Sequence, residues 1–260
     1  MNTAAYCEKY NELTRLFLER FASDYKNENI VFSPMSIILL LGIVADAVQG
    51  KSRDEILRVI GGKFSYEELL GLFKEIQDDA AESGSLVSSN AVCIKDRISR
   101  SIQEEYPKRL MDTFAGKLFS SDDIVRDVNA WVKEKTNGMI EKAADESMSQ
   151  MMACLMNAIA FDAEWMEEYE EEDIHKGSFY NENGTVSEVQ MLESKEDTYI
   201  EDEFFTGFVK PYKDEKYSFM ALLPKKKKNI SFLLRLAKQM DFSKLYNRAT
   251  YGTVYVTMPE

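Results

Sequence analysis

Apolar residues recur at helical spacing near the start of the chain. Leu13, Phe17 and Phe21 would share one face of a helix, and the polar residues around Asn27 break this pattern. The short apolar run 30–32 that follows has the composition of a strand. The opening of the chain is therefore predicted to be a helix followed by a short strand.

A serine followed by a proline predicts the start of the second helix. Ser33 is a favourable N-cap residue and Pro34 suits the first helical position, so a helix is expected from Pro34 to about Gln49. Gly50 would be its left-handed C-terminal cap. Apolar residues surround this helix on nearly every side, which is typical of a buried helix.

The rest of the chain mixes helices and strands. Ser52 and Glu55 form an S-x-x-E capping box that opens a third helix. Further helices are expected at 66–76, 102–114, 124–135 and 230–240, and strands at 86–94, 152–161, 186–191, 208–212, 217–223 and 253–258. Helices cluster early, strands cluster late and no linker-like segment separates them. The prediction is a single α+β domain over residues 1–260.

Charge and composition exclude several kinds of partner. The chain has 32 Lys and Arg against 45 Asp and Glu, a net charge of −13, so we expect no nucleic acid and no anionic membrane as a partner. The longest apolar run, 37–45, is far shorter than the roughly 20 residues that span a bilayer. The N-terminus lacks the basic region of a secretion signal, and three widely spaced cysteines indicate a reducing compartment. A cytoplasmic location is expected, with an extracellular one left open.

Several short motifs could indicate catalysis or ligand binding, but each has a simpler structural interpretation. Gly50-Lys51-Ser52 is similar to the end of a phosphate-binding loop, but it would join two helices instead of following a buried strand, so an NTPase is only a minor alternative. His175 is the only histidine, which excludes a multi-histidine metal centre. The acidic stretch 164–173 and the lysine run 225–228 are expected to be exposed, and the cysteines to be small buried apolar residues. We predict no enzyme, metal, cofactor or small-molecule substrate.

Three multi-residue motifs follow one another along the chain in an informative order. The first is NIVFSPMSIILLLGIVADAVQGKSRDEIL at 29–57, and the second is the N-A-W-V segment at 129–132 with Thr136, Gly138 and Ile140. The third is N-A-I-A-F at 157–161, followed by Trp165. In this order and spacing the motifs resemble the serpin family of serine protease inhibitors. Shorter matches at 179, 189–191, 223–224 and 258–259 extend the resemblance over essentially the whole chain.

The resemblance implies both a fold and a mechanism. It implies a serpin-like α+β fold, with helices packed on a large mixed or antiparallel main sheet and two further β-sheets. In the family, a reactive loop is cleaved as bait and then inserts as a new strand into the main sheet, carrying the trapped protease with it. The expected function is inhibition of a target protease by a suicide substrate, with the serine class as the expected target and the cysteine class as the second candidate. A non-inhibitory serpin-like binding, chaperone or storage protein is the alternative.

Four residues match positions that have roles in the family. Ser33, Ser36 and Asn157 correspond to the shutter beneath the opening sheet, and Trp165 corresponds to the breach at the top of that sheet. Ser33 and Ser36 lie three residues apart at the start of a buried helix, and the amide of Asn157 is a suitable partner for a buried hydroxyl. We therefore expect Ser36 and Asn157 to be hydrogen-bonded. In the alternative interpretation, Ser33 is only an N-cap and Ser36 only a first-turn serine.

The end of the chain differs from the family pattern. The strand 253–258 is followed directly by Pro259-Glu260, which would leave an unpaired strand at the terminus. The resemblance implies that the hinge, the reactive loop, the shutter histidine and the closing strands lie beyond Glu260. The domain is therefore expected to be C-terminally incomplete, with no reactive centre in this chain. Glu168-Tyr169 also replaces the proline-phenylalanine that usually follows the tryptophan.

Overall fold

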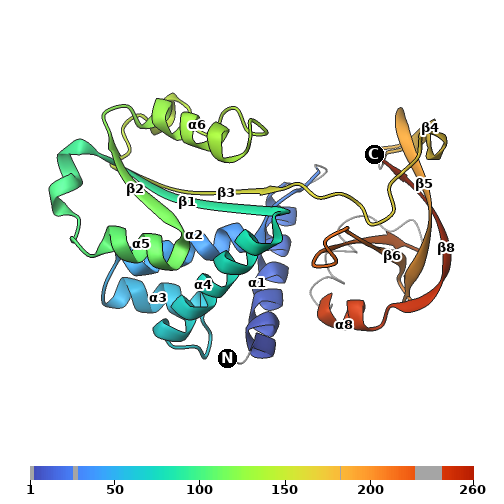
Figure 1. The fold of residues 1–260 in the computed structure, drawn as a ribbon, viewed down its shortest axis with the longest axis horizontal. Helices are drawn as coiled ribbons and strands as arrows, with labels where there is room; N and C mark the ends of the chain where they lie inside the picture. The colour runs from blue at the N-terminus through green and yellow to red at the C-terminus, as the bar shows by residue number, and fades with distance from the viewer. Residues whose placement is uncertain (1–2, 26–28, 182, 226–241) are drawn as a thin grey trace. The chain divides into compact units, whose positions relative to one another are not determined.

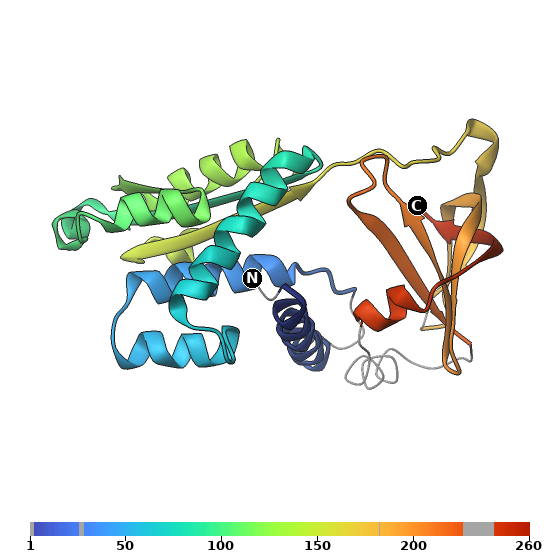
Figure 2. The same cartoon turned by 60° about the horizontal axis from the view of Figure 1, so that its bottom comes forward.

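The computed structural model describes residues 3–25, 29–181, 183–225 and 242–260. These residues form two compact units, shown in Figures 1 and 2. Unit one contains residues 1–13 and 31–162, and unit two contains residues 14–30 and 163–260. The division passes through α1, which runs from Thr3 to Asp24. No helix in the described ranges is both long and apolar enough to cross a membrane.

Unit one is built on a mixed sheet of three strands. β1 (Leu86–Lys95) is central, β2 (Gly116–Ser121) pairs with it in parallel and β3 (Ala153–Phe161) pairs with it antiparallel. In the β1–β3 ladder, Asn90 lies opposite Asn157 and Cys93 lies opposite Cys154. Because successive side chains of a strand point to opposite faces, the two asparagines and the two cysteines lie on different faces of the sheet.

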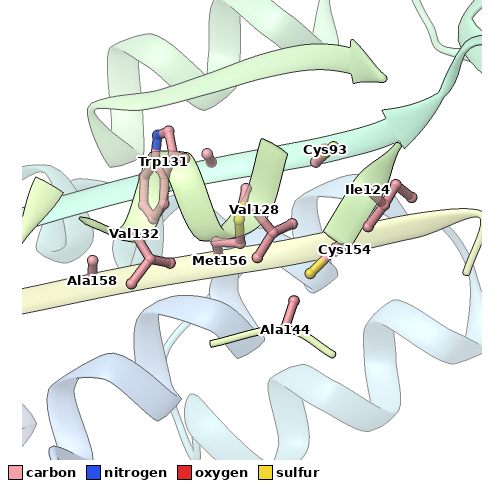
Figure 3. Close-up of a cluster of buried hydrophobic side chains, with 10 residues drawn as sticks. Cys93, Ile124, Val128, Trp131, Val132, Ala144, Cys154, Met156 and Ala158 are labelled. Carbon is pink, nitrogen blue, oxygen red and sulfur yellow. The ribbon is translucent and has the colours of Figure 1, made fainter. Parts of the chain in front are cut away.

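Helices cover both faces of this sheet. α2 (Pro34–Ala47) packs on β3, α4 (Tyr66–Ser83) on β1 and α5 (Tyr106–Phe114) on β2, while α3 (Lys51–Ile60) packs on α2. α6 (Ile124–Lys135) lies on the opposite face, as Figure 1 shows. Its apolar side closes a core over alternate residues of the two long strands (Figure 3): Ala91, Cys93, Ile124, Val128, Trp131, Val132, Ala144, Cys154, Met156 and Ala158. Short 3-10 helices at Asp96–Ser101 and Glu146–Met148 complete the unit.

The start of α2 follows the prediction, but its end does not. Ser33 Oγ accepts a hydrogen bond from the backbone N–H of Ser36 at 3.2 Å, as an N-cap does. The helix ends at Ala47, because Arg53 Nε donates to the carbonyl oxygens of Ala45 and Val48 at 3.0 and 2.9 Å. A side chain from the next helix thus occupies the carbonyl groups that the end of α2 leaves unbonded.

Two further predictions around this corner were wrong. Gly50 has a φ of +61°, but it is the N-cap of α3 rather than the C-terminal cap of α2, and α3 begins at Lys51 without a capping box at Ser52. The apolar run 30–32 belongs to no strand in the structure. Gly50-Lys51-Ser52 does join two helices, in agreement with the sequence interpretation.

Unit two is an antiparallel sheet organised around one long strand. Its elements are β4 (Ile174–Tyr180), β5 (Val186–Glu201), β6 (Phe205–Pro211), β7 (Ser218–Pro224), α8 (Phe242–Asn247) and β8 (Thr250–Pro259), with a 3-10 helix at Glu171–Asp173. The first half of β5 pairs with β4, and its end pairs with β6, which pairs with β7. The two smaller sheets expected from the sequence are therefore joined through β5 into one five-stranded sheet.

The last strand is paired, contrary to the sequence expectation. β8 pairs antiparallel with β5 along residues 191–199, on the edge opposite β4 and β6. The pattern of 250–259 alone could not identify β5 as a partner nearly sixty residues earlier. The predicted helix at 230–240 and most of the lysine run 225–228 lie outside the described residues.

Candidate functional site

A chain of buried amides crosses the sheet of unit one. The Asn157 Nδ2–H group on β3 donates to Asn90 Oδ1 on β1 at 2.9 Å. The Asn90 Nδ2–H group donates in turn to the carbonyl oxygen of Phe114, at the end of α5, at 2.7 Å. Asn90 is only 2% exposed. Three separate elements are thereby linked through one side chain that the sequence analysis did not single out.

Two polar atoms on the same face of the sheet have no hydrogen-bond partner among the described residues. They are Asn157 Oδ1 and Ser88 Oγ, and both are buried. Ser88 lies two residues before Asn90 on β1, so their side chains point the same way. A buried acceptor without a donor costs free energy. A further hydrogen-bond donor on this face of the sheet would therefore stabilise the folded chain.

The expected bond between Ser36 and Asn157 is not formed in the described structure, where the partner of Asn157 is Asn90. Residues directly opposite in an antiparallel ladder have Cβ atoms about 4.5–5.5 Å apart, so a cross-strand amide is an immediate neighbour. Ser33 caps α2, and α2 packs on β3. The assignment of Ser33, Ser36 and Asn157 to a shutter stays a prediction. The hydrogen bond from Asn157 makes Asn90 a further candidate for this group.

A second cluster, in unit two, surrounds Trp165. The indole stacks on the Tyr212 ring with centroids 4.4 Å apart and an interplanar angle of 11°. The Phe219 ring meets the indole edge to face at 5.9 Å. Trp165 and Tyr212 also form an isolated β-bridge. The segment that follows β3 is thus fixed within unit two by aromatic contacts and by its backbone.

A buried ion pair lies beneath this aromatic cluster. Lys210 on β6 is 2% exposed, and its Nζ donates to Glu196 Oε1 on β5 at 2.7 Å. Glu196 is 5% exposed, and a cavity of about 110 Å³ borders the pair. No signal in the sequence marked these residues, because a lone charge in a short strand usually lies on the solvent side.

The other candidate residues are arranged as surface groups. Glu164 and Glu168 of the acidic stretch are exposed and lie 2.5 and 3.8 Å from the ammonium of Lys213. His175 is exposed and lies 3.7 Å from Glu193. Within the part of the chain that the structure describes, no group of three histidine, cysteine or acidic side chains has the arrangement of a metal site.

The three cysteines are free and differ in environment. Cys93 and Cys154 are buried in the core under α6, whereas Cys7 is exposed, so the prediction of buried cysteines was wrong for Cys7. Burial raises the pKa of the Cys93 thiol to about 11. A thiol with a raised pKa carries little thiolate at neutral pH and is a poor nucleophile. The buried cysteines therefore act as core residues.

Comparison with known families identifies this architecture. The family model described as "Serpin (serine protease inhibitor)" matches residues 8–260. The chain belongs to the serpin family. Its helices, mixed main sheet and antiparallel second sheet form the α+β serpin fold that the sequence predicted. Many serpins inhibit proteases, and members of the family are in general inhibitors rather than catalytic enzymes.

Curated relatives of this serpin match only part of their own length. An "Uncharacterized serpin-like protein" of Thermococcus kodakarensis is 26% identical over 212 residues, which are 78% of this chain and 49% of that protein. "Serpin-ZX" of Arabidopsis thaliana is 27% identical over 190 residues, which are 67% of this chain and 48% of that protein. This serpin therefore spans about half the length of these two relatives.

Solved serpin structures superpose closely on the chain. The native state of the thermophilic serpin Tengpin has a TM-score of 0.87 at 26% identity, over 100% of this chain and 67% of that one. Native protease nexin-1 with heparin has a TM-score of 0.88 at 20% identity, over 100% of this chain and 75% of that one. The second match demonstrates the fold alone.

Proposed function

We propose that this serpin, in a form extended beyond Glu260, inhibits a protease by cleavage and insertion of a reactive loop. The target class is a serine protease, with a cysteine protease as the second candidate. The proposal rests on membership of the family and on the open edge and the unbonded Asn157 oxygen of β3. These features matter because loop trapping requires a main sheet that accepts one more strand. We also propose a reducing compartment for the protein, on the basis of its three free cysteines.

The observation that carries the proposal is the unbonded oxygen of Asn157. Among the described strands, β3 pairs with β1 on one edge only, so its other edge presents unpaired backbone groups. Asn157 lies in the middle of this strand, and its Oδ1 is buried without a donor among the residues that the structure describes. An added strand would pair with the open edge, and a side-chain donor near it would satisfy the oxygen. The shutter histidine implied by the family resemblance is a donor of this kind.

The test compares two lengths of the protein. A form of the protein extended beyond Glu260 and the 260-residue chain are each incubated with a panel of serine and cysteine proteases. The extended form should give a complex with one class that survives boiling in detergent, because the trapped protease is held as a covalent acyl-enzyme. The 260-residue chain should inhibit none of them.

Two controls make the test decisive. A serine protease whose catalytic serine has been blocked by a sulfonyl fluoride should give no complex, because the acyl bond cannot form. Potent inhibition by the 260-residue chain would show that the mechanism is not loop trapping. Cleavage of the extended form by every protease, without any complex, would contradict inhibition and favour the non-inhibitory binding, chaperone or storage alternative.

A further inference from the structure

The ammonium group of Lys210 lies close to the faces of two aromatic rings. Its Nζ is 5.7 Å from the centroid of the Trp165 indole and 4.8 Å from the centroid of the Tyr169 ring. Both distances are within the range in which a cation is attracted to the face of an aromatic ring. The lysine is almost completely buried, so water hardly weakens this attraction.

Glu196 makes this buried charge tolerable. A buried ammonium group needs a nearby anion, and the Glu196 carboxylate lies 2.7 Å from Lys210 Nζ. The carboxylate approaches from β5, while the two rings belong to the segment that precedes β4. Lys210 lies opposite Phe219 in the β6–β7 ladder, and Phe219 also contacts Trp165. The charge of Lys210 is thus directed at the indole by two strands and one acidic partner.

We propose that Lys210, held by Glu196, is a positioning residue for Trp165. The cation attracts the indole face and keeps the ring stacked on Tyr212, and it attracts the Tyr169 ring in the same way. The segment carrying both rings is thereby fixed to the β6–β7 hairpin. If the proposed function holds, and Trp165 has the breach role that the family resemblance implies, Lys210 also sets how readily loop insertion starts.

Fluorescence of Trp165 tests the proposal without any protease. The chain has two tryptophans, so a Trp131→Phe background leaves Trp165 as the only emitter. Lys210→Met keeps the length of the side chain but removes the charge, and it should shift the emission to the red and raise acrylamide quenching about twofold as the indole loosens. Lys210→Arg keeps a cation that can stack on the ring, and it should preserve both signals.

A charge swap separates positioning from simple pairing. Lys210→Glu with Glu196→Lys restores an ion pair, so it should melt above the Lys210→Glu single variant. It places a carboxylate against the indole face, so the red shift and the quenching should remain. Recovery of the normal emission by the swap would overturn the proposal, because the ion pair alone would then position the ring. Unchanged emission in Lys210→Met with a lowered melting temperature would overturn it as well.

Two measurements keep the test independent of folding and of the proposed function. If the Trp131→Phe background does not fold, 5-fluorotryptophan incorporation gives two separate fluorine resonances, and Trp165→Phe assigns them. The Trp165 resonance should then shift and broaden in Lys210→Met and not in Lys210→Arg, and an unmoved resonance would count against the proposal. Loss of protease trapping with intact fluorescence results would contradict the proposed function and leave the role of Lys210 standing.

Discussion

Asn157 and Asn90 face each other across β3 and β1, and the side-chain amide of Asn157 donates to Asn90 Oδ1 at 2.9 Å. Asn90 passes the connection on to the carbonyl oxygen of Phe114. Within the described parts of the chain, Asn90 therefore has two partners in this network, whereas Asn157 has one and keeps an oxygen without a donor. The two asparagines should consequently differ in what their removal costs.

Asn90→Ala should lower the free energy of unfolding more than Asn157→Ala. Replacing Asn90 leaves the Asn157 amide and the Phe114 carbonyl group without partners, at about 1–3 kcal/mol for each orphaned group. Replacing Asn157 orphans one oxygen of Asn90 and also removes an acceptor that was already unsatisfied. Urea unfolding followed by circular dichroism measures both values, and equal losses would contradict the network.

The matched control for this prediction is Ser36→Ala. The described residues give the Ser36 hydroxyl no hydrogen-bond partner, so its loss should cost no more than about 0.5 kcal/mol. The Asn90/Asn157 double variant should show a coupling of at least about 0.5 kcal/mol, whereas Ser36 and Asn157 should be additive. Strong coupling of Ser36 to Asn157 would restore the pairing expected from the sequence.

Arg109→Met should destabilise unit one through the carboxylate of Asp46. Asp46 is 3% exposed, and Arg109 Nε lies 3.0 Å from its Oδ1. Removing the guanidinium leaves a buried anion without its cation, which should cost about 1–3 kcal/mol because part of the arginine side chain is exposed. Arg126→Met is the matched control, since its pair with Asp127 lies at the surface and should contribute less to stability than the Arg109–Asp46 pair. Equal decreases in melting temperature for Arg109→Met and Arg126→Met would show that burial of Asp46 does not strengthen its ion pair.

Tyr66 should make stability fall at alkaline pH. Burial raises the pKa of the Tyr66 phenol, and so does its hydrogen bond to the Asp46 carboxylate. Because the folded pKa lies above the unfolded one, the stabilisation is complete below about pH 10 and is lost as the pH rises through the folded pKa. Tyr66→Phe should therefore reduce the decline in melting temperature above pH 10. An identical pH profile in the variant would contradict this assignment.

The cysteines should react in the order of their exposure. Iodoacetamide at pH 8 should modify Cys7 and leave Cys93 and Cys154 unmodified, because both are buried and the pKa of Cys93 is raised to about 11. Mass spectrometry of tryptic peptides locates the label. In urea all three should react, which controls for the reagent. Rapid modification of Cys93 in the folded chain would mean that the core under α6 opens readily.

Local signals in the sequence identified some elements well. α6 begins at Ile124 and ends at Lys135, the bounds expected from its apolar spacing, because its whole apolar stripe faces one sheet. The end of α2 was misplaced because Arg53, a residue of the next helix, bonds to its final carbonyl groups. Such contacts depend on how two helices meet, which no local pattern specifies.

The contacts of the site residues were even harder to predict from local sequence patterns than the ends of the helices. Asn157 and Trp165 were selected as candidates because they belong to motifs, but the partner of Asn157 depends on strand register. Asn90 left only a weak signal, because the polar residues Ser88 and Ser89 directly precede it in the same strand. Lys210 and Glu196 left none, because Lys210 lies against the rings of Trp165 and Tyr169 and Glu196 is paired with Lys210, and these are contacts of the folded chain.

The continuity of β5 limits where this protein can change in length. Its residues pair first with β4 and β8 and finally with β6, with one register shift in the β8 ladder between Glu196 and Thr198, and Tyr199 has a partner on both edges. A residue inserted or deleted inside 186–201 would shift the pairing of β5 with β6 relative to its pairing with β4 and β8. Each β5 side chain after that point would then lie on the opposite face of the sheet. Natural insertions and deletions in close relatives should therefore collect in the hairpin turns at 181–185 and 212–217, and leave the length of β5 unchanged.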